Sequence, residues 1–151
     1  MGQSTAKENI HEGFSIPMTS PADRHQQVLV VEDDESVTKM LLWLLRSAGF
    51  SAQTASTGQE ALQTLDREAV DAVLLDLGLP DQRAGDVIQR LRAWKGHPEW
   101  LVISVMDPGE AARKYGPLGD RFISKPFDPW VLIRRLDGLL DAHQKPQGAL
   151  D

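Results

Sequence analysis

The stretch that decides the fold is Val28-Leu29-Val30-Val31-Glu32-Asp33-Asp34-Glu35, in which four apolar residues run directly into four acidic ones. A short, continuous apolar run rich in β-branched residues is typical of a strand that is covered on both faces in a parallel sheet. The stretch therefore predicts a buried parallel strand with carboxylates at its carboxyl end.

Strand and helix patterns alternate along the rest of the chain. Strand patterns are found at 28–31, 50–55, 72–75, 101–105 and 121–123. Amphipathic helix patterns are found at 37–48, 59–65, 87–94, 110–115 and 129–142. Gly49 is expected to end the first helix, and Asp128 with Pro129 to begin the last as N-cap and first helical residue. The helix at 87–94 is expected to turn Val87, Ile88, Leu91 and Trp94 inward.

Five strands alternating with five helices indicate an α/β fold with a doubly wound, five-stranded parallel sheet. In such sheets ligands bind beyond the carboxyl ends of the strands, near the switch in strand order. The functional site is therefore expected where the acidic run follows the first strand.

The length of 151 residues, with 41% hydrophobic and 25% charged residues, indicates one soluble domain. We expect this domain at 27–143, between a polar N-terminal tail at 1–26 and a short C-terminal tail at 144–151. Two interpretations stand for the segment from Phe14 to Met18, which is either an inert part of the tail or a short docking segment. Few residues follow the last predicted helix, so no output domain is expected on this chain.

Composition excludes several functions. A net charge of −6 argues against binding nucleic acid through a basic face, and the absence of cysteine excludes disulfide and thiol chemistry. Four histidines show no ligand spacing and are expected to be solvated: His11, His25, His97 and His143. No apolar run approaches the roughly 20 residues that a membrane span needs, and no signal peptide pattern is present. A cytoplasmic protein without direct nucleic acid or membrane partners is expected.

Polar residues collect at the predicted strand ends: Glu32, Asp33, Asp76, Ser104 and Lys125. Carboxylates a few ångströms apart repel by roughly 4 kcal/mol per pair at an effective dielectric constant of 20, so such a cluster needs a cation. Carboxylate oxygens without soft ligands favour Mg²⁺ or Mn²⁺. A lysine ammonium and a serine hydroxyl suit phosphoryl oxygens. Together these residues predict a place where an aspartate attacks a phosphoryl group.

Each of these features alone has an ordinary explanation. Acidic residues after a strand often cap the next helix, as expected for Asp34, and a lone aspartate such as Asp76 is usually a turn residue. A Lys-Pro pair is common in loops. Only the combination, in this order and on these strands, indicates phosphoryl chemistry.

The residues that carry a family resemblance are 28–35, Val73-Leu74-Leu75-Asp76-Leu77-Gly78-Leu79-Pro80, Val102-Ile103-Ser104-Val105 and Phe122-Ile123-Ser124-Lys125-Pro126-Phe127. With them, residues 27–143 resemble the receiver domain of bacterial two-component response regulators, the CheY-like family. The resemblance implies a flavodoxin-like fold and a phosphoacceptor switch. It does not imply an enzyme, beyond self-phosphorylation from small donors and slow autodephosphorylation.

The resemblance also implies a role for each site residue. Asp76 is expected to accept a phosphoryl group from a phosphohistidine on a sensor histidine kinase or histidine phosphotransfer protein. Mg²⁺ is expected on Glu32, Asp33, Asp76 and the Gly78 backbone carbonyl, and Ser104 and Lys125 are expected to bind phosphoryl oxygens. Ser104 and Phe122 are the expected switch residues, which alter a surface that meets a downstream protein target. The peptide bond before Pro126 is expected to be cis.

Three features depart from the family pattern. The loop from Pro80 to Gly85 is expected to be one residue longer than usual. Gly78 and Met106 each lie two residues beyond an expected site residue, and neither can hold a hydrolytic water by a side-chain hydrogen bond, so a long-lived phosphorylated state is predicted. Val105 is expected to narrow access for small phosphodonors.

The aromatic residues Trp43 and Trp130, together with Leu42, leave two interpretations open. They either widen the core face of their helices or form a partner surface, because the first helix commonly meets phosphotransfer partners in this family.

Two other functions are open to a chain with these patterns. An unphosphorylated interaction scaffold with the same fold would not need Glu32, Asp33, Asp76, Ser104 or Lys125. A phosphatase of the haloacid dehalogenase type needs a second aspartate two residues after the nucleophile, where this chain has Gly78.

Overall fold

The computed structural model describes residues 25–94 and 98–144 of the chain. The predictions about the segment from Phe14 to Met18, about most of the two tails, and about His11 and His97 lie outside these residues. Among the residues described, no helix is both long and apolar enough to cross a membrane.

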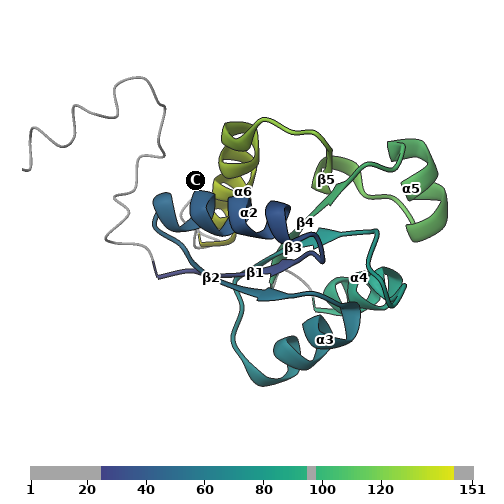
Figure 1. The fold of residues 1–151 in the computed structure, drawn as a ribbon, viewed down its shortest axis with the longest axis horizontal. Helices are drawn as coiled ribbons and strands as arrows, with labels where there is room; N and C mark the ends of the chain where they lie inside the picture. Colours follow the sequence, from purple (N-terminus) through teal and green to yellow (C-terminus); the bar gives the residue numbers. More distant parts are fainter. Residues whose placement is uncertain (1–24, 95–97, 145–151) are drawn as a thin grey trace, which may run out of the picture.

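The strands form one parallel sheet in the order β2-β1-β3-β4-β5 (Figure 1). Their bounds are Gln27–Val31 for β1, Ser51–Ala55 for β2, Ala72–Asp76 for β3, Glu99–Ser104 for β4 and Phe122–Ser124 for β5. The order reverses between β1 and β3, which is the switch point expected for a doubly wound sheet. The predicted fold class is confirmed.

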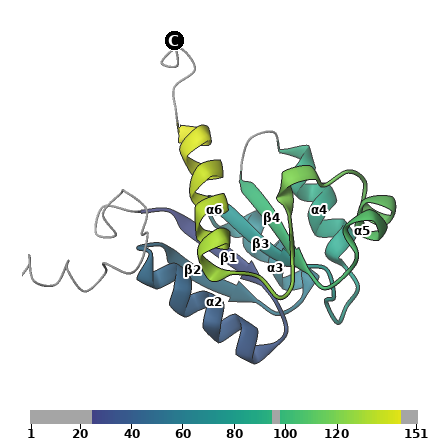
Figure 2. The same cartoon turned by 90° about the horizontal axis from the view of Figure 1, so that it is seen from above.

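Helices cover both faces of this sheet (Figure 2). Their bounds are Glu35–Ser47 for α2, Gly58–Arg67 for α3, Ala84–Ala93 for α4, Pro108–Tyr115 for α5 and Pro129–Gln144 for α6, with a 3-10 turn η2 at Gly119–Arg121. The helices α2 and α6 pack on one face, while α3 and α4 pack on the other.

Alternating strand residues supply both layers of the core. In β1, Leu29 and Val31 join the cluster under α3 and α4, while Val28 and Val30 join the cluster under α2 and α6. All four are fully buried. Because burial of such a side chain is worth roughly 1.5–3 kcal/mol before entropy is subtracted, the apolar run favours β1 as an inner strand, between β2 and β3.

Local sequence explains how the elements near the site begin and end. The Asp34 carboxylate caps α2 by accepting from the Val37 backbone N–H at 3.0 Å, and Gly49 follows this helix with a left-handed φ of 96°. Asp128 accepts from the Trp130 N–H at 2.8 Å at the start of α6. The Lys125–Pro126 peptide bond is cis. These four predictions are confirmed.

The structure corrects three predictions. Trp94 is not on the inward side of its helix, because α4 ends at Ala93 and the Trp94 ring is 46% exposed. Trp43 is 67% exposed, so the widened core face is wrong for this residue. Trp130, in contrast, packs against the core cluster under α2 and α6. Val105 lies just beyond β4 rather than within it and is 80% exposed.

Candidate phosphoacceptor site

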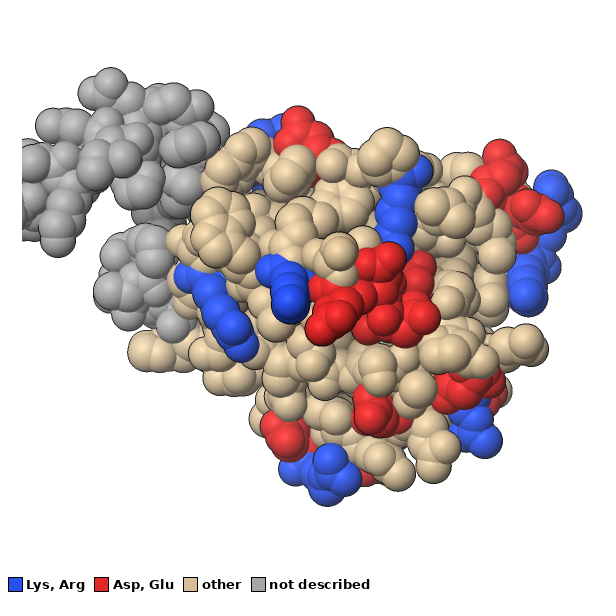
Figure 3. Space-filling view, in the orientation of Figure 1, with Lys and Arg blue, Asp and Glu red and all other residues tan. Residues whose placement is uncertain are grey.

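Three carboxylates meet at the carboxyl end of the sheet. Glu32 and Asp33 follow β1, and Asp76 is the last residue of β3, the neighbouring strand. One oxygen from each lies within 4.8 Å of the others. Figure 3 shows acidic side chains gathered in one patch on this side of the molecule, with basic side chains beside it. Sheet topology thus brings together carboxylates that lie more than 40 residues apart in the sequence.

Lys125 brings a positive charge to the cluster from the loop after β5. Its Nζ lies 3.0 Å from Glu32 Oε1 and 3.5 Å from Asp76 Oδ1. Burial lowers the pKa of Lys125, but the Glu32 hydrogen bond and the Asp76 charge outweigh this effect, so that the pKa lies above its usual value. The ammonium is therefore firmly protonated beside Asp76.

Glu32 is buried and held in place from two sides. Its Oε2 accepts from the Asp34 backbone N–H at 3.1 Å, while Oε1 accepts from Lys125. The pKa of Glu32 lies above its usual value. Burial raises it most and repulsion from Asp76 adds to the rise, while the hydrogen bonds from Lys125 and Asp34 lower it by less. A further cation near Glu32 would favour its charged form.

The residues present fit a hard divalent cation. Three carboxylates share the site with a single ammonium, so the pairing among them leaves excess negative charge. The backbone at Gly78 passes close by, since a Cβ built there would lie 3.7 Å from Asp76 Oδ2. Carboxylate and carbonyl oxygens are the ligands that Mg²⁺ takes in proteins.

The two expected switch residues lie on adjacent strands. Ser104 ends β4 and is 2% exposed, and its Oγ accepts from the Met106 backbone N–H at 3.0 Å. Phe122 is half-buried and pairs with Val102, two residues before Ser104, so that alternation places both side chains toward the same face of the sheet. Asp76 pairs in register with Ile103, so Ser104 lies one residue beyond this pair at the carboxyl end of the sheet. Phe122 pairs with Val102 and therefore lies further from the carboxylates.

One residue near the site has contacts that the sequence does not reveal. The Asp81 carboxylate, in the loop between β3 and α4, accepts from the backbone N–H groups of Gly58 and Gln59 at 3.0 and 2.9 Å. Burial raises the pKa of Asp81, but the hydrogen bonds from Gln59, Gly58 and Arg83 outweigh it and hold the pKa below its usual value. The Pro80-Asp81 pair predicts a turn, but nothing local indicates a partner 22 residues away.

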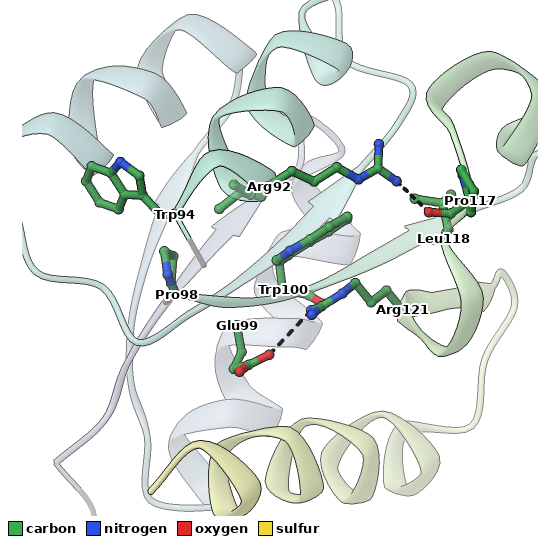
Figure 4. Close-up of a pocket in the computed structure, with 9 residues that line it drawn as sticks. Arg92, Trp94, Pro98, Glu99, Trp100, Pro117, Leu118 and Arg121 are labelled. Atoms are coloured by element: carbon green, nitrogen blue, oxygen red, sulfur yellow. Dashed lines mark hydrogen bonds and ion pairs between the residues drawn. The ribbon is translucent and has the colours of Figure 1, made fainter. Parts of the chain in front are cut away.

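A second polar cluster, at the opposite end of β4, surrounds a cavity of about 300 Å³ (Figure 4). Trp100 lies at its centre, with the Arg92 and Arg121 guanidinium carbons 5.5 and 4.7 Å from the ring centroid. Arg92 donates to the carbonyls of Tyr115 and Pro117, and Arg121 donates to the Trp100 carbonyl at 3.0 Å. Arg121 also pairs with Glu99 at 3.4 Å. We call Arg92, Trp100 and Arg121 the arginine–tryptophan cluster; its contacts link the end of α4 and the start of β4 to the segment before β5.

The exposed side of α2 carries an apolar and basic surface. A shallow pocket there is lined by Lys39, Leu42, Trp43, Arg46 and Ser47. We call these five residues the α2 surface. The helix begins at Glu35, directly after the acidic residues of the site.

The family model described as the response regulator receiver domain matches residues 28–137. Because this match covers more than half of the chain, the protein belongs to that family and is a receiver domain of two-component signalling.

Relatives and solved structures agree with this assignment. The sensory transduction protein RegX3 of Mycobacterium tuberculosis is 39% identical over 115 residues, which are 75% of this chain and 50% of RegX3. The DNA-binding response regulator MtrA of Mycobacterium leprae is 36% identical over 74% of this chain and 49% of MtrA. The chain thus spans about half the length of these curated relatives. A CheY-like receiver domain from Methylobacillus flagellatus has a TM-score of 0.67 at 28% identity, covering 77% of this chain and 99% of that chain.

Proposed function

We propose that this receiver domain accepts a phosphoryl group on Asp76 from a phosphohistidine, with Mg²⁺ bound, and that the resulting acyl phosphate switches a protein-interaction surface. The observation that carries the proposal is the joint placement of Asp76 with two further carboxylates and with Lys125, whose Nζ lies 3.5 Å from Asp76 Oδ1. An interaction scaffold would gain nothing from three carboxylates at such close range, because they repel one another.

The chemistry follows from these groups. A carboxylate oxygen of Asp76 attacks phosphorus, the bond from phosphorus to the imidazole nitrogen breaks, and the nitrogen keeps the electron pair. Lys125 stabilises the charge on the transferred phosphoryl oxygens. Glu32, Asp33, Asp76 and the Gly78 carbonyl would hold Mg²⁺, which would supply charge neutralisation when bound.

The surroundings of Asp76 support a slow loss of the phosphoryl group. Gly78 has no side chain, and Met106 packs against the core cluster while lining a groove beside Gly78. Neither offers a side-chain hydrogen bond to an attacking water. We propose that Met106→Glu shortens the lifetime of the phosphorylated form by placing an acceptor there, and that Met106→Leu leaves the lifetime unchanged.

The α2 surface supports a protein as phosphodonor. Trp43 is 67% exposed there, and Lys39 and Arg46 flank it on the same helix. We propose that a sensor histidine kinase or a histidine phosphotransfer protein binds this surface. Replacing Trp43 with alanine would then slow phosphotransfer from the protein donor without slowing phosphorylation by acetyl phosphate.

We further propose that the domain acts as a switch rather than as an enzyme with a separate substrate, that it works in the cytoplasm, and that it meets its downstream target through protein contacts. MtrA is a DNA-binding response regulator, and this chain matches about half of it. The net charge of −6 supports the view that the receiver domain itself makes no direct contact with nucleic acid.

The proposal is tested by incubating the protein and Mg²⁺ with a phosphorylated histidine phosphotransfer protein carrying a radiolabel. Label should move to the wild-type chain but not to Asp76→Asn, and Lys125→Ala should accept it far more slowly. Wild-type protein that stays unlabelled with both this donor and acetyl phosphate would instead support the scaffold.

A further inference from the structure

We propose that Asp81 is a positioning residue, which ties the loop at 77–83 to the N-terminus of α3 and thereby fixes the Gly78 carbonyl for the metal. This inference rests on the proposed function, because it concerns the metal site that the phosphoacceptor needs. Three observations on the described residues carry it.

The first contact is the hydrogen bonding of the Asp81 carboxylate. It accepts from Gly58 N–H at 3.0 Å, from Gln59 N–H at 2.9 Å and from Arg83 N–H at 3.3 Å. The first two belong to α3, and the third belongs to the loop itself. A carboxylate at the N-terminal end of a helix is also favoured by the helix dipole. One side chain therefore joins two segments that the chain separates by more than 20 residues.

The second observation is that α3 needs Asp81 to complete its first turn. Its own cap, the Thr57 hydroxyl, accepts from the Glu60 N–H at 3.1 Å, and the Thr57 carbonyl accepts from the Ala61 N–H at 3.1 Å. The N–H groups of Gly58 and Gln59 have no partner within the helix. Asp81 accepts from both, so the loop and the helix end are complementary.

The third observation is a close backbone approach on the other side of the same contact. A Cβ built at Gly58 would lie 2.5 Å from Arg83 Cβ and 3.0 Å from the Arg83 carbonyl carbon and oxygen. Only glycine at position 58 allows the loop to lie this near. Between Asp81 and Arg83, Gln82 adopts a left-handed φ of 58°, which is uncommon for a residue other than glycine. The loop is thus held in one conformation.

The anchoring of Asp81 restricts the backbone at Gly78, because few free torsion angles separate the two residues. Gly78 lies three residues before Asp81, Pro80 has a fixed φ, and Leu79 is 4% exposed in the core. With Leu79 and Asp81 both anchored, the backbone at Gly78 has little freedom. Groups that orient a metal ligand typically change metal affinity by about 10–100-fold when they are removed.

The test compares variants on the two sides of the contact with a control on α3. Asp81→Ala removes the acceptor, and Gly58→Ala pushes Arg83 away, so the two should weaken Mg²⁺ binding alike, by about tenfold. Asp81→Asn, a milder change that keeps one acceptor oxygen, should fall between Asp81→Ala and wild type. Thr57→Ala removes the cap of the same helix without touching the loop and should leave Mg²⁺ affinity unchanged.

Mg²⁺ affinity is measured by calorimetric titration of the folded full chain, beside hydrogen exchange of the Gly58 and Gln59 amides. Faster exchange in Asp81→Ala together with weaker Mg²⁺ binding supports the proposal. Equal Mg²⁺ affinity in wild type, Asp81→Ala and Gly58→Ala overturns it while leaving the phosphoacceptor proposal intact. Wild-type protein that binds no Mg²⁺ overturns both.

Discussion

The charged groups at the two ends of β4 differ in whether the protein's own contacts hold them or leave them available to a ligand. At the Glu99 end, the guanidinium groups of the arginine–tryptophan cluster are held by the protein itself, because both donate to backbone carbonyls and lie over Trp100, and Arg121 also pairs with Glu99 at 3.4 Å. At the Ser104 end, three carboxylates share one lysine. The first arrangement stabilises the fold, whereas the second keeps negative charge available for a cation and a phosphoryl group.

This difference shows how position in a parallel sheet separates stability from function. Carboxyl ends of neighbouring strands converge on one site, and residues gathered there are free to serve a ligand. Groups at the other end are under no such demand and are held by hydrogen bonds within the protein. Substitutions at the two ends should therefore change stability in opposite directions.

The largest effect is expected from Trp100→Ala. The ring is 5% exposed and both guanidinium groups of the cluster lie over it, so its loss should lower the free energy of unfolding by about 3–5 kcal/mol. Denaturant unfolding measures this, with Trp100→Phe as a milder control. A loss below about 1 kcal/mol would show that the cluster is not a structural core.

A smaller loss is expected from Arg92→Ala. Two backbone carbonyls lose a charged donor, which should cost about 1–3 kcal/mol in the same unfolding experiment. Arg92→Lys should fail to restore stability, because an ammonium lacks the fork that reaches both carbonyls. The exposed Arg113 offers a matched control, and equal losses for Arg92→Ala and Arg113→Ala would contradict the assignment.

A substitution at the carboxylate site is expected to change stability in the opposite direction, as a gain. Asp33→Asn removes one of the three repelling carboxylates and should stabilise the protein by about 1 kcal/mol when metal is absent. Mg²⁺ at 100 times its dissociation constant should stabilise the wild type by about 2.7 kcal/mol, and the variant by less. Thermal unfolding with Mg²⁺ and with a chelator measures both. If Asp33→Asn is less stable than the wild type without metal, substitutions at the two ends of β4 do not change stability in opposite directions.

The smallest effect is expected at Asp81, whose two carboxylate oxygens accept from backbone N–H groups. The pKa of Asp81 is lowered in the folded protein, so its hydrogen bonds stabilise the fold above the unfolded pKa near 3.8 and this contribution is lost as pH falls through the lower, folded pKa. Asp81→Asn should show a shallower loss of stability below pH 4. Identical pH profiles for the two proteins would show that these bonds do not persist in solution.

Much of the fold could be predicted because it depends on local pattern. The apolar runs fix the buried strands, and Asp34 and Gly49 mark the ends of α2. The convergence of Glu32 and Asp76 followed from sheet topology. These features need only periodicity, capping chemistry and the rule for parallel sheets.

Other features depend on contacts between segments far apart in the chain. The bonds of Asp81 to α3 and of Arg92 to the Tyr115 and Pro117 carbonyls have no local signal. Trp94 was misplaced because the helical pattern does not show that α4 ends at Ala93, which leaves the ring exposed beneath the Arg90 guanidinium. Periodicity places a residue on a face but does not identify its distant partner.

The measurement that tests the central claim most directly is the intact mass of the protein after incubation with acetyl phosphate. The wild type should gain one phosphoryl group with Mg²⁺ and none with a chelator, and Asp76→Asn should gain none in either case. If access past the exposed Val105 limits this small donor, a phosphohistidine protein should give the same pattern. A gain that survives the chelator or the Asp76→Asn substitution would contradict the account.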